Sequence, residues 1–311
     1  MKIIFLLAAV IAAMVLWTRS LSRKAVRTVP PAGRFAPVKG GTIHFVEAGP
    51  KQAQTLVMIH GLTGNLQHFT YALTDLLAQD FHVIALDRPG NGYSTRDHDD
   101  MAALDIQARM IWEFLDTRGV TRPVLVGHSL GGAVALQMAL LRPNGPSALA
   151  LLAPATQPQE AVPEVFRPLQ LRRPWTRRAL AHTLAVPATK FTRSRVLNMV
   201  FAPEPVPPAF NTRGGGALAL RPETFIAASS DLMAVSGTME DLHDLYTRGL
   251  PPGAILFGTD DAILSPDHQG MPMAQYGLPT ELLPGRGHML PLTAPAECAD
   301  FIRRTTAKAG L

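Results

Sequence analysis

A serine between two glycines follows a short apolar run near the middle of the chain. Residues 127–131 (GHSLG) have the spacing G-x-S-x-G and come directly after Val124–Val126 and before a helical stretch. A sharp turn from a strand into a helix lifts the serine hydroxyl clear of the backbone, and the flanking glycines let the two elements approach closely. The helix N-terminus beyond it favours negative charge. This pattern predicts that Ser129 is a nucleophile.

Two other reactive groups follow later apolar runs. Asp260 and Asp261 follow residues 254–257, and His288 follows residues 280–283. An imidazole can take the proton of an attacking hydroxyl, and a carboxylate can hold that imidazole in the required tautomer. The order serine, aspartate, histidine, each after an apolar run, predicts a catalytic triad.

Backbone N–H groups near Ser129 are candidates for binding an oxyanion. Residues 60–64 (HGLTG) end an earlier apolar run, and the residue after the His-Gly pair can offer its N–H to a developing negative charge. The residue after the nucleophile offers a second N–H. We therefore expect the N–H groups of Leu62 and Leu130 to form an oxyanion hole.

The elements that must position these groups alternate between β-like apolar runs and helical stretches. The predicted strands are 42–47, 55–60, 82–87, 123–127, 148–153, 254–257 and 280–283, and the predicted helices are 66–79, 101–118, 130–141 and 294–308. Apolar strands separated by helices indicate an α/β fold with a mostly parallel sheet covered on both faces. Residues 155–235 are rich in proline and break this alternation, so we interpret them as a helical cap over the C-terminal edge of the sheet.

Five motifs in this order resemble those of the α/β-hydrolase superfamily: HGLTG, DRPGNGYS, GHSLGG, GTDDAIL and GRGHMLPLTAP. The resemblance runs from about residue 41 to the C-terminus. The chain is most similar to capped members with a serine nucleophile and esterase, lipase-like, haloperoxidase-like or C–C hydrolase activity. We interpret Asp87 and the turn that follows it, DRPGNGYS, as structural.

The resemblance implies roles for individual residues. Ser129 is then the nucleophile, His288 the base and Asp261 the acid, because the family usually places the acid three residues after a glycine, here Gly258. Asp260 is the alternative acid. The other acid position of the superfamily falls at Pro154-Ala155 in this chain and carries no carboxylate.

These residues predict a serine hydrolase that cleaves the ester bond of a small or lipid-like acyl substrate and needs no cofactor. Three alternatives stay open: an acyltransferase or perhydrolase, a C–C bond hydrolase, and a binding module without catalysis. The histidines show no metal-ligand spacing, so no metal site is predicted. The sequence does not name the substrate or the oligomeric state, because specificity resides in the cap and pocket.

The N-terminus predicts a membrane or export segment. Ile3–Trp17 is an uninterrupted apolar run, preceded by Lys2 and followed by several basic residues. As a helix it would span roughly 22 Å of a hydrocarbon core about 30 Å thick, so an anchor over residues 1–20 is marginal. The excess of positive charge after the run favours a cytoplasmic catalytic domain. The alternative is export after cleavage of a signal peptide at Ser20-Leu21-Ser22.

Composition and charge place the remaining limits. The 311 residues carry 47% hydrophobic residues, enough for a full core, and one cysteine, Cys298, which excludes an internal disulfide. We predict a linker over residues 21–40 and a hydrolase domain over residues 41–311.

The net charge of +5 is concentrated in the N-terminus and in residues 160–221, which contain ten basic and three acidic residues. Because aromatic interleaving and reading modules are missing, we expect no nucleic acid partner. The basic cap segment is a candidate for contact with anionic lipid headgroups.

Overall fold

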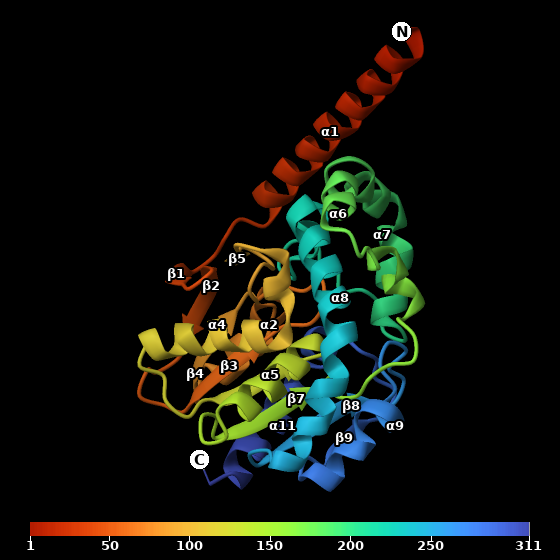
Figure 1. Cartoon of the computed structure of the whole chain (residues 1–311). Helices are drawn as coiled ribbons and strands as arrows, with labels where there is room; N and C mark the ends of the chain where they lie inside the picture. Colours follow the sequence, from red (N-terminus) through yellow and green to blue (C-terminus); the bar gives the residue numbers. More distant parts are fainter. Residues whose placement is uncertain (311) are drawn as a thin grey trace.

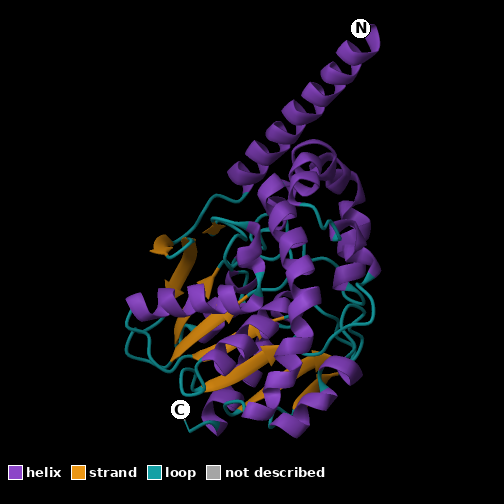
Figure 2. Ribbon diagram, in the orientation of Figure 1, coloured by secondary structure: helices purple, strands orange, loops and turns teal. Residues whose placement is uncertain are grey.

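The computed structural model describes residues 1–310 and is built around a nine-stranded sheet (Figures 1 and 2). The strand order is β1-β2-β4-β3-β6-β7-β8-β9, with β5 paired to β2. Neighbours from β4 through β9 in that order pair in parallel, whereas β2 pairs antiparallel with β1, β4 and β5. The strands are β1 (Arg34–Val38), β2 (Gly41–Ala48), β3 (Thr55–Ile59), β4 (His82–Leu86), β5 (Thr95–Arg96), β6 (Val124–His128), β7 (Ala148–Leu152), β8 (Gly253–Gly258) and β9 (Thr280–Leu283).

The parallel strands are buried on both faces. Every residue of β4, β6 and β7 is buried, and their sequences are near-continuous apolar runs. Such runs are expected where helices cover both sides of a parallel sheet. The predicted α/β architecture with a mostly parallel central sheet is thereby confirmed.

Two pairs of helices cover the sheet. Helices α3 (Leu73–Leu77) and α11 (Pro295–Lys308) pack together, and α4 (Leu104–Thr117) packs against α5 (Leu130–Leu141). Most of α5 is buried, because it lies under other helices as well as against the sheet. The single helix predicted over residues 66–79 is instead two, α2 (Gln67–Thr70) and α3. They are separated at Ala72, whose φ of −156° is incompatible with a continuous helix.

A helical cap lies between β7 and β8, as the sequence predicts. It contains the 3₁₀ helices η2 (Glu164–Leu169) and η4 (Gly216–Leu220), and the helices α6 (Pro174–Leu180), α7 (Val186–Phe201) and α8 (Pro222–Leu245). A π-helical segment, η3 (Ala181–Ala185), joins α6 directly to α7. The boundary that we predicted at residue 235 falls inside α8. This helix continues because Met239 and Leu242, in its second half, pack into the main core beside α5.

The N-terminal helix α1 (Lys2–Thr28) projects away from the rest of the molecule (Figure 1). It is long and apolar enough to cross a membrane. A signal sequence near an N-terminus has the same length and composition. Its last turns differ from its first: Thr18, Leu21 and Ala25 are buried, and α1 packs there on η3, η4 and α7. The spacing of these residues, three and four apart, places them on one side of the helix.

Residues 21–40, predicted as a linker, are largely regular structure. Helix α1 continues to Thr28 because its C-terminal turns pack against the cap. Arg34–Val38 forms strand β1, which turns at Gly40 and pairs antiparallel with β2. Pro37 is tolerated because β1 is an edge strand, where the missing N–H leaves no ladder bond unmade.

Candidate active site

Ser129 occupies the tight turn between β6 and α5. Its φ of 54° and ψ of −123° are unusual for a residue with a side chain and hold it at a strained position. The two flanking glycines allow the turn to form. A Cβ at Gly127 would come within 2.6 Å of the Gly131 carbonyl oxygen, and one at Gly131 within 2.0 Å of the Ile59 carbonyl oxygen. The close approach expected from G-x-S-x-G is therefore present.

Ser129, His288 and Asp261 form one hydrogen-bonded chain. The Ser129 Oγ lies 3.0 Å from Nε2 of His288, and Nδ1 of His288 lies 2.7 Å from Oδ2 of Asp261. The other carboxylate oxygen of Asp261 accepts hydrogen bonds from the N–H groups of Ile263 and Leu264, at 2.8 and 2.9 Å. These bonds fix the carboxylate, which is fully buried, beneath the imidazole.

Asp260, the alternative acid, lies apart from this chain. Its side chain is exposed and accepts a hydrogen bond from the Thr259 hydroxyl. The two aspartates are adjacent in sequence, but the side chain of Asp261 is buried beside His288 whereas that of Asp260 lies at the surface. The geometry therefore brings together the three residues expected from the family's spacing.

A second histidine holds the backbone of His288 in place. The ring Nε2 of His128 lies 3.0 Å from the His288 carbonyl oxygen, and the two rings are 5.1 Å apart. Burial lowers the pKa of His128 well below its ordinary value, so its ring is neutral and Nε2 donates to that carbonyl. His128 occupies the variable position before the serine, where the sequence pattern does not predict this role.

The loop after β3 lies directly against Ser129. A Cβ added at Gly61 would come within 2.8 Å of the Ser129 Cβ. The Leu62 N–H, next along this loop, has no acceptor among residues 1–310. Leu130 is the first residue of α5, where helix geometry leaves the N–H without an internal partner. Both N–H groups predicted for the oxyanion hole are thus available beside the serine.

A fully buried arginine lies behind the loop. The Arg88 guanidinium donates from Nε to the His60 carbonyl, at 2.9 Å, and from Nη2 to the Gly61 carbonyl, at 3.2 Å. Nδ1 of His60 lies 2.9 Å from the same Gly61 carbonyl. The Gly61 carbonyl and the Leu62 N–H belong to the same peptide unit. These donors therefore fix the orientation of that unit and make its N–H a stronger hydrogen-bond donor to an oxyanion.

The charge of Arg88 is balanced from the cap. Asp231, in α8, is fully buried and lies 2.8 Å from Arg88 and 2.5 Å from Arg96. Although burial alone would raise it, these two guanidinium groups lower the pKa of Asp231. Asp231 therefore connects α8, through Arg88, to the loop that follows β3.

Asp87 joins more distant segments than a local turn requires. Its Oδ1 accepts the Leu66 N–H at 2.7 Å, and its Oδ2 accepts the Tyr93 N–H at 2.8 Å. The ring of His44, on β2, lies 2.6 Å from the same Oδ2. We expected Asp87 to form only local hydrogen bonds within residues 87–94. Its long-range partners could not be predicted, because no sequence pattern indicates which distant groups contact a buried carboxylate.

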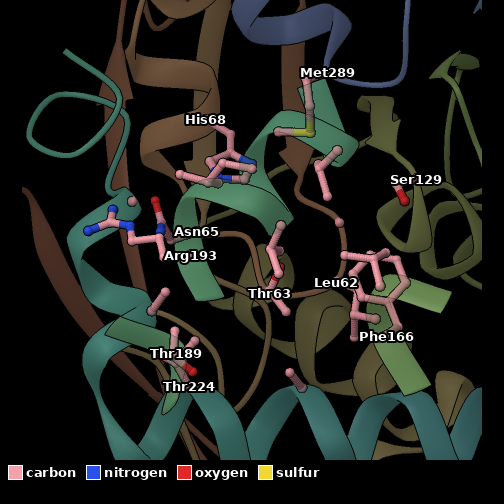
Figure 3. A pocket seen from close by; sticks show the side chains of 18 of the residues that line it. Leu62, Thr63, Asn65, His68, Ser129, Phe166, Thr189, Arg193, Thr224 and Met289 are labelled. Atoms are coloured by element: carbon pink, nitrogen blue, oxygen red, sulfur yellow. The ribbon is translucent and has the colours of Figure 1, made fainter. Parts of the chain in front are cut away.

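Two cavities meet at Ser129. The first, cavity A, has a volume of about 220 Å³, and its lining includes His68, Arg193 and His288. Figure 3 labels His68 and Arg193 among the residues that line it. The second, cavity B, has a volume of about 160 Å³ and is lined mainly by apolar side chains, from Leu130 to Met239 and Leu264. Leu62, Ser129 and Phe166 line both. Among residues 1–310, no group of three or more His, Cys, Asp or Glu side chains is arranged to hold a metal ion.

Known proteins share this arrangement of elements. A family model described as "Alpha/beta hydrolase family" matches residues 56–301. Among solved structures, the enol-lactonase from Burkholderia xenovorans LB400 superimposes with a TM-score of 0.73 at 19% identity, covering 88% of this chain and 100% of that one. A likeness at that identity shows a common fold.

Two curated relatives are similar in sequence. The dihydrolipoyllysine-residue acetyltransferase component of the acetoin cleaving system of Pseudomonas putida is 29% identical over 269 residues, which are 85% of this chain and 66% of that protein. The putative carbamate hydrolase RutD of Variovorax paradoxus (strain S110) is 34% identical over 110 residues, which are 35% of this chain and 41% of that protein. The chain thus spans less than two thirds of the length of each.

Proposed function

The chain belongs to the alpha/beta hydrolase family, and on that premise we propose that it is a serine hydrolase that cleaves a carboxylic ester of a small or lipid-like substrate. One observation carries the proposal. A serine on a strained turn lies 3.0 Å from the imidazole of His288, and that imidazole lies 2.7 Å from a buried carboxylate. This is the geometry of an activated nucleophile with an oriented base.

The first half of the reaction forms an acyl-enzyme. Nε2 of His288 takes the Ser129 proton as Oγ attacks the ester carbonyl, and Asp261 stabilises the imidazolium. The N–H groups of Leu62 and Leu130 bind the oxyanion, each worth about 3 kcal/mol in comparable sites. The carbonyl re-forms as the alcohol leaves with the proton held by His288.

The second half releases the acid. Water enters beside His288, which takes one of its protons while the oxygen attacks the acyl carbon. The second tetrahedral intermediate collapses, the acid departs, and the Ser129 oxygen recovers its proton from His288. No step in this cycle needs a cofactor.

The cavities support an apolar acyl substrate. Cavity B has an apolar lining that includes Ala155, Val162 and Ile263, and it opens at Ser129. Apolar pockets of this kind bind hydrocarbon through the area that they remove from water.

Transfer of the acyl group to an acceptor other than water is the alternative. The Pseudomonas putida relative is an acetyltransferase component by name, which favours this alternative over C–C cleavage. Competing nucleophiles separate the two: with ethanol or hydroxylamine present, a transferase yields mainly the transfer product, whereas a hydrolase yields mainly the acid.

The proposed function is tested by labelling followed by an ester panel. A fluorophosphonate probe is expected to label the wild-type chain at Ser129, and 4-nitrophenyl esters of increasing acyl length are expected to be hydrolysed. A folded protein that neither reacts with the probe nor cleaves any ester of the panel would contradict the proposal.

We further propose that α1 is an uncleaved membrane anchor with the catalytic domain in the cytoplasm. Most of its first 16 residues are exposed and apolar, and Trp175, Leu184 and Phe191 are exposed on the cap beside it. The full chain is expected to stay with membranes after carbonate extraction, and a variant lacking residues 3–13 to be released. N-terminal sequencing that begins near Arg23, with soluble activity, would instead indicate a signal peptide.

A further inference from the structure

The wall of cavity A opposite Ser129 has a polar character that the ester chemistry does not use. Asn65, His68 and Arg193 line this part of the cavity, and Figure 3 shows them grouped on the side away from the serine. The segment 210–215 touches all three. The Phe210 ring lies 5.9 Å from that of His68, the Asn211 side chain accepts a hydrogen bond from Arg193, and the Gly215 carbonyl accepts one from Asn65 at 3.3 Å.

His68 lines cavity A, and neither of its ring nitrogens has a hydrogen-bond partner among residues 1–310. The residue is 7% exposed and Nδ1 is buried, so Nε2 is the nitrogen through which the ring can reach a ligand. Burial lowers the pKa of His68 to about 4, so the ring is neutral near pH 7 and carries one N–H donor. A buried imidazole without a partner is costly, and a polar group of a ligand would remove that cost.

Arg193 brings a positive charge to the same wall. Its guanidinium forms no ion pair with any carboxylate of residues 1–310, and burial lowers its pKa. Arg177, a cap arginine that is buried, differs directly from Arg193, because it pairs with Asp99 at 2.8 Å. A half-buried guanidinium remains charged and favours an anionic partner.

The position of His288 decides which part of an ester enters cavity A. His288 lines cavity A and does not line cavity B. Under the mechanism above, His288 must deliver its proton to the leaving alcohol oxygen. The alcohol portion therefore belongs in cavity A, and the acyl chain belongs in cavity B.

We propose that the natural substrates are carboxylic esters whose alcohol portion carries an anionic phosphate or carboxylate group, which pairs with Arg193 and accepts a hydrogen bond from His68. This inference rests on the proposed ester hydrolysis and adds the class of alcohol. Selection comes from the charge of Arg193 at the far wall, while bond cleavage takes place at Ser129.

Three matched esters test the inference. They share a hexanoyl group and differ at the alcohol: 2-phosphoethyl, 2-hydroxyethyl and 2-(trimethylammonio)ethyl, compared at pH 8. For the wild-type chain, kcat/KM is expected to be at least about tenfold higher for the phosphate ester than for the neutral one, and lowest for the cation, because a hydrogen-bonded charge pair is worth more than a neutral contact. The same phosphate ester with a long acyl chain, presented in neutral vesicles, is expected to be cleaved faster than the soluble one if the source is a lipid.

Variants assign the preference to Arg193. Arg193→Gln is expected to bring the ratio of phosphate to neutral ester close to one, and Arg193→Lys, which keeps the charge, to restore it in part. The matched control is Arg195→Gln, because Arg195 lies two residues away, is exposed and does not line the cavity. It is expected to leave the ratio unchanged.

The outcomes separate the two proposals. Equal kcat/KM for the three esters would overturn this inference and leave ester hydrolysis standing. If none is cleaved, the fluorophosphonate label and the 4-nitrophenyl ester panel decide whether the proposed function fails, and calorimetry with ethyl phosphate on the Ser129→Ala chain decides the binding question. Binding that Arg193→Gln abolishes supports the anion site, and absence of binding overturns it.

Discussion

The floor and the roof of the site are built differently. The floor consists of loops at the ends of β3, β4, β6, β8 and β9, and most of its polar groups are buried and hydrogen-bonded, including both oxygens of Asp261. The roof is the cap, which offers mostly apolar side chains and leaves Trp175 and Phe191 largely exposed. The floor is thus arranged to hold atoms at fixed distances, whereas the roof provides space and charge that select a substrate.

The largest expected effect is at the floor. Ser129→Ala removes the nucleophile without enlarging any side chain, so the fold is expected to persist while kcat for ester hydrolysis falls by about four orders of magnitude or more. Steady-state kinetics with a 4-nitrophenyl ester, together with circular dichroism, provide the measurement. A variant that retains more than about a hundredth of the wild-type kcat would contradict the assignment.

The two adjacent aspartates provide a matched pair on the same loop. Asp261→Asn is expected to lower kcat by roughly 10⁴, because the amide would favour the wrong tautomer of His288. Asp260→Asn, at an exposed side chain, is expected to change kcat by less than about threefold. The reverse ranking would move the acid to Asp260 and would separate activity from the observed hydrogen bonds.

Asp231 tests whether roof and floor are one cooperative unit. Asp231→Asn leaves the guanidinium of Arg88 buried without its counter-ion, so the free energy of unfolding is expected to fall by about 3–5 kcal/mol. The matched control is Asp241→Asn, at an exposed position of the same helix, with an expected change under about 0.5 kcal/mol. Urea unfolding measures both, and equal losses would show that the ionic contact contributes little.

The smallest expected effect concerns the buried histidine of cavity A. Because the folded-state pKa of His68, about 4, lies below its ordinary value of 6.5, the unfolded chain binds more protons between these values. Stability is therefore complete above about pH 6.5 and is lost as the pH falls toward 4. His60 and His128, whose pKa values are also lowered by burial, add to this loss.

His68→Gln is accordingly expected to reduce the stability loss between pH 7.5 and pH 5 by about 2 kcal/mol. Urea unfolding at the two pH values is the measurement, and His98→Gln, at an exposed histidine, is the control. An unchanged pH dependence in His68→Gln would mean that this ring is hydrated in the folded chain.

The sequence predicted the floor far better than the roof. Ser129, Asp261 and His288 each follow an apolar strand at a recognisable spacing, and parallel strands bring their C-terminal ends to one edge. The structure places these three side chains within hydrogen-bonding distance. The sheet itself was also predictable, because buried parallel strands are read as apolar runs.

The remaining features depend on contacts between distant residues. Nothing in DRPGNGYS indicates that Arg88 would reach Asp231, which lies 143 positions later, or that it would hold the Gly61 carbonyl. Strand β1 was missed because Pro37 and the flanking glycine are typical of a linker. In the cap, ten basic residues were visible, but only the fold shows that Arg193 lines a cavity while Arg177 is paired.

The packing of its last turns fixes the direction of α1 relative to the rest of the molecule. Because Thr18, Leu21 and Ala25 are packed into the cap and Tyr93 donates a hydrogen bond to the Val29 carbonyl just beyond, the helix has no hinge where it meets the body. Its free arm, Lys2 to Trp17, is about 24 Å long. A bilayer or a protein that binds this arm therefore also sets the orientation of the whole molecule. A tilt of the arm must then carry the cap and the mouths of its cavities with it.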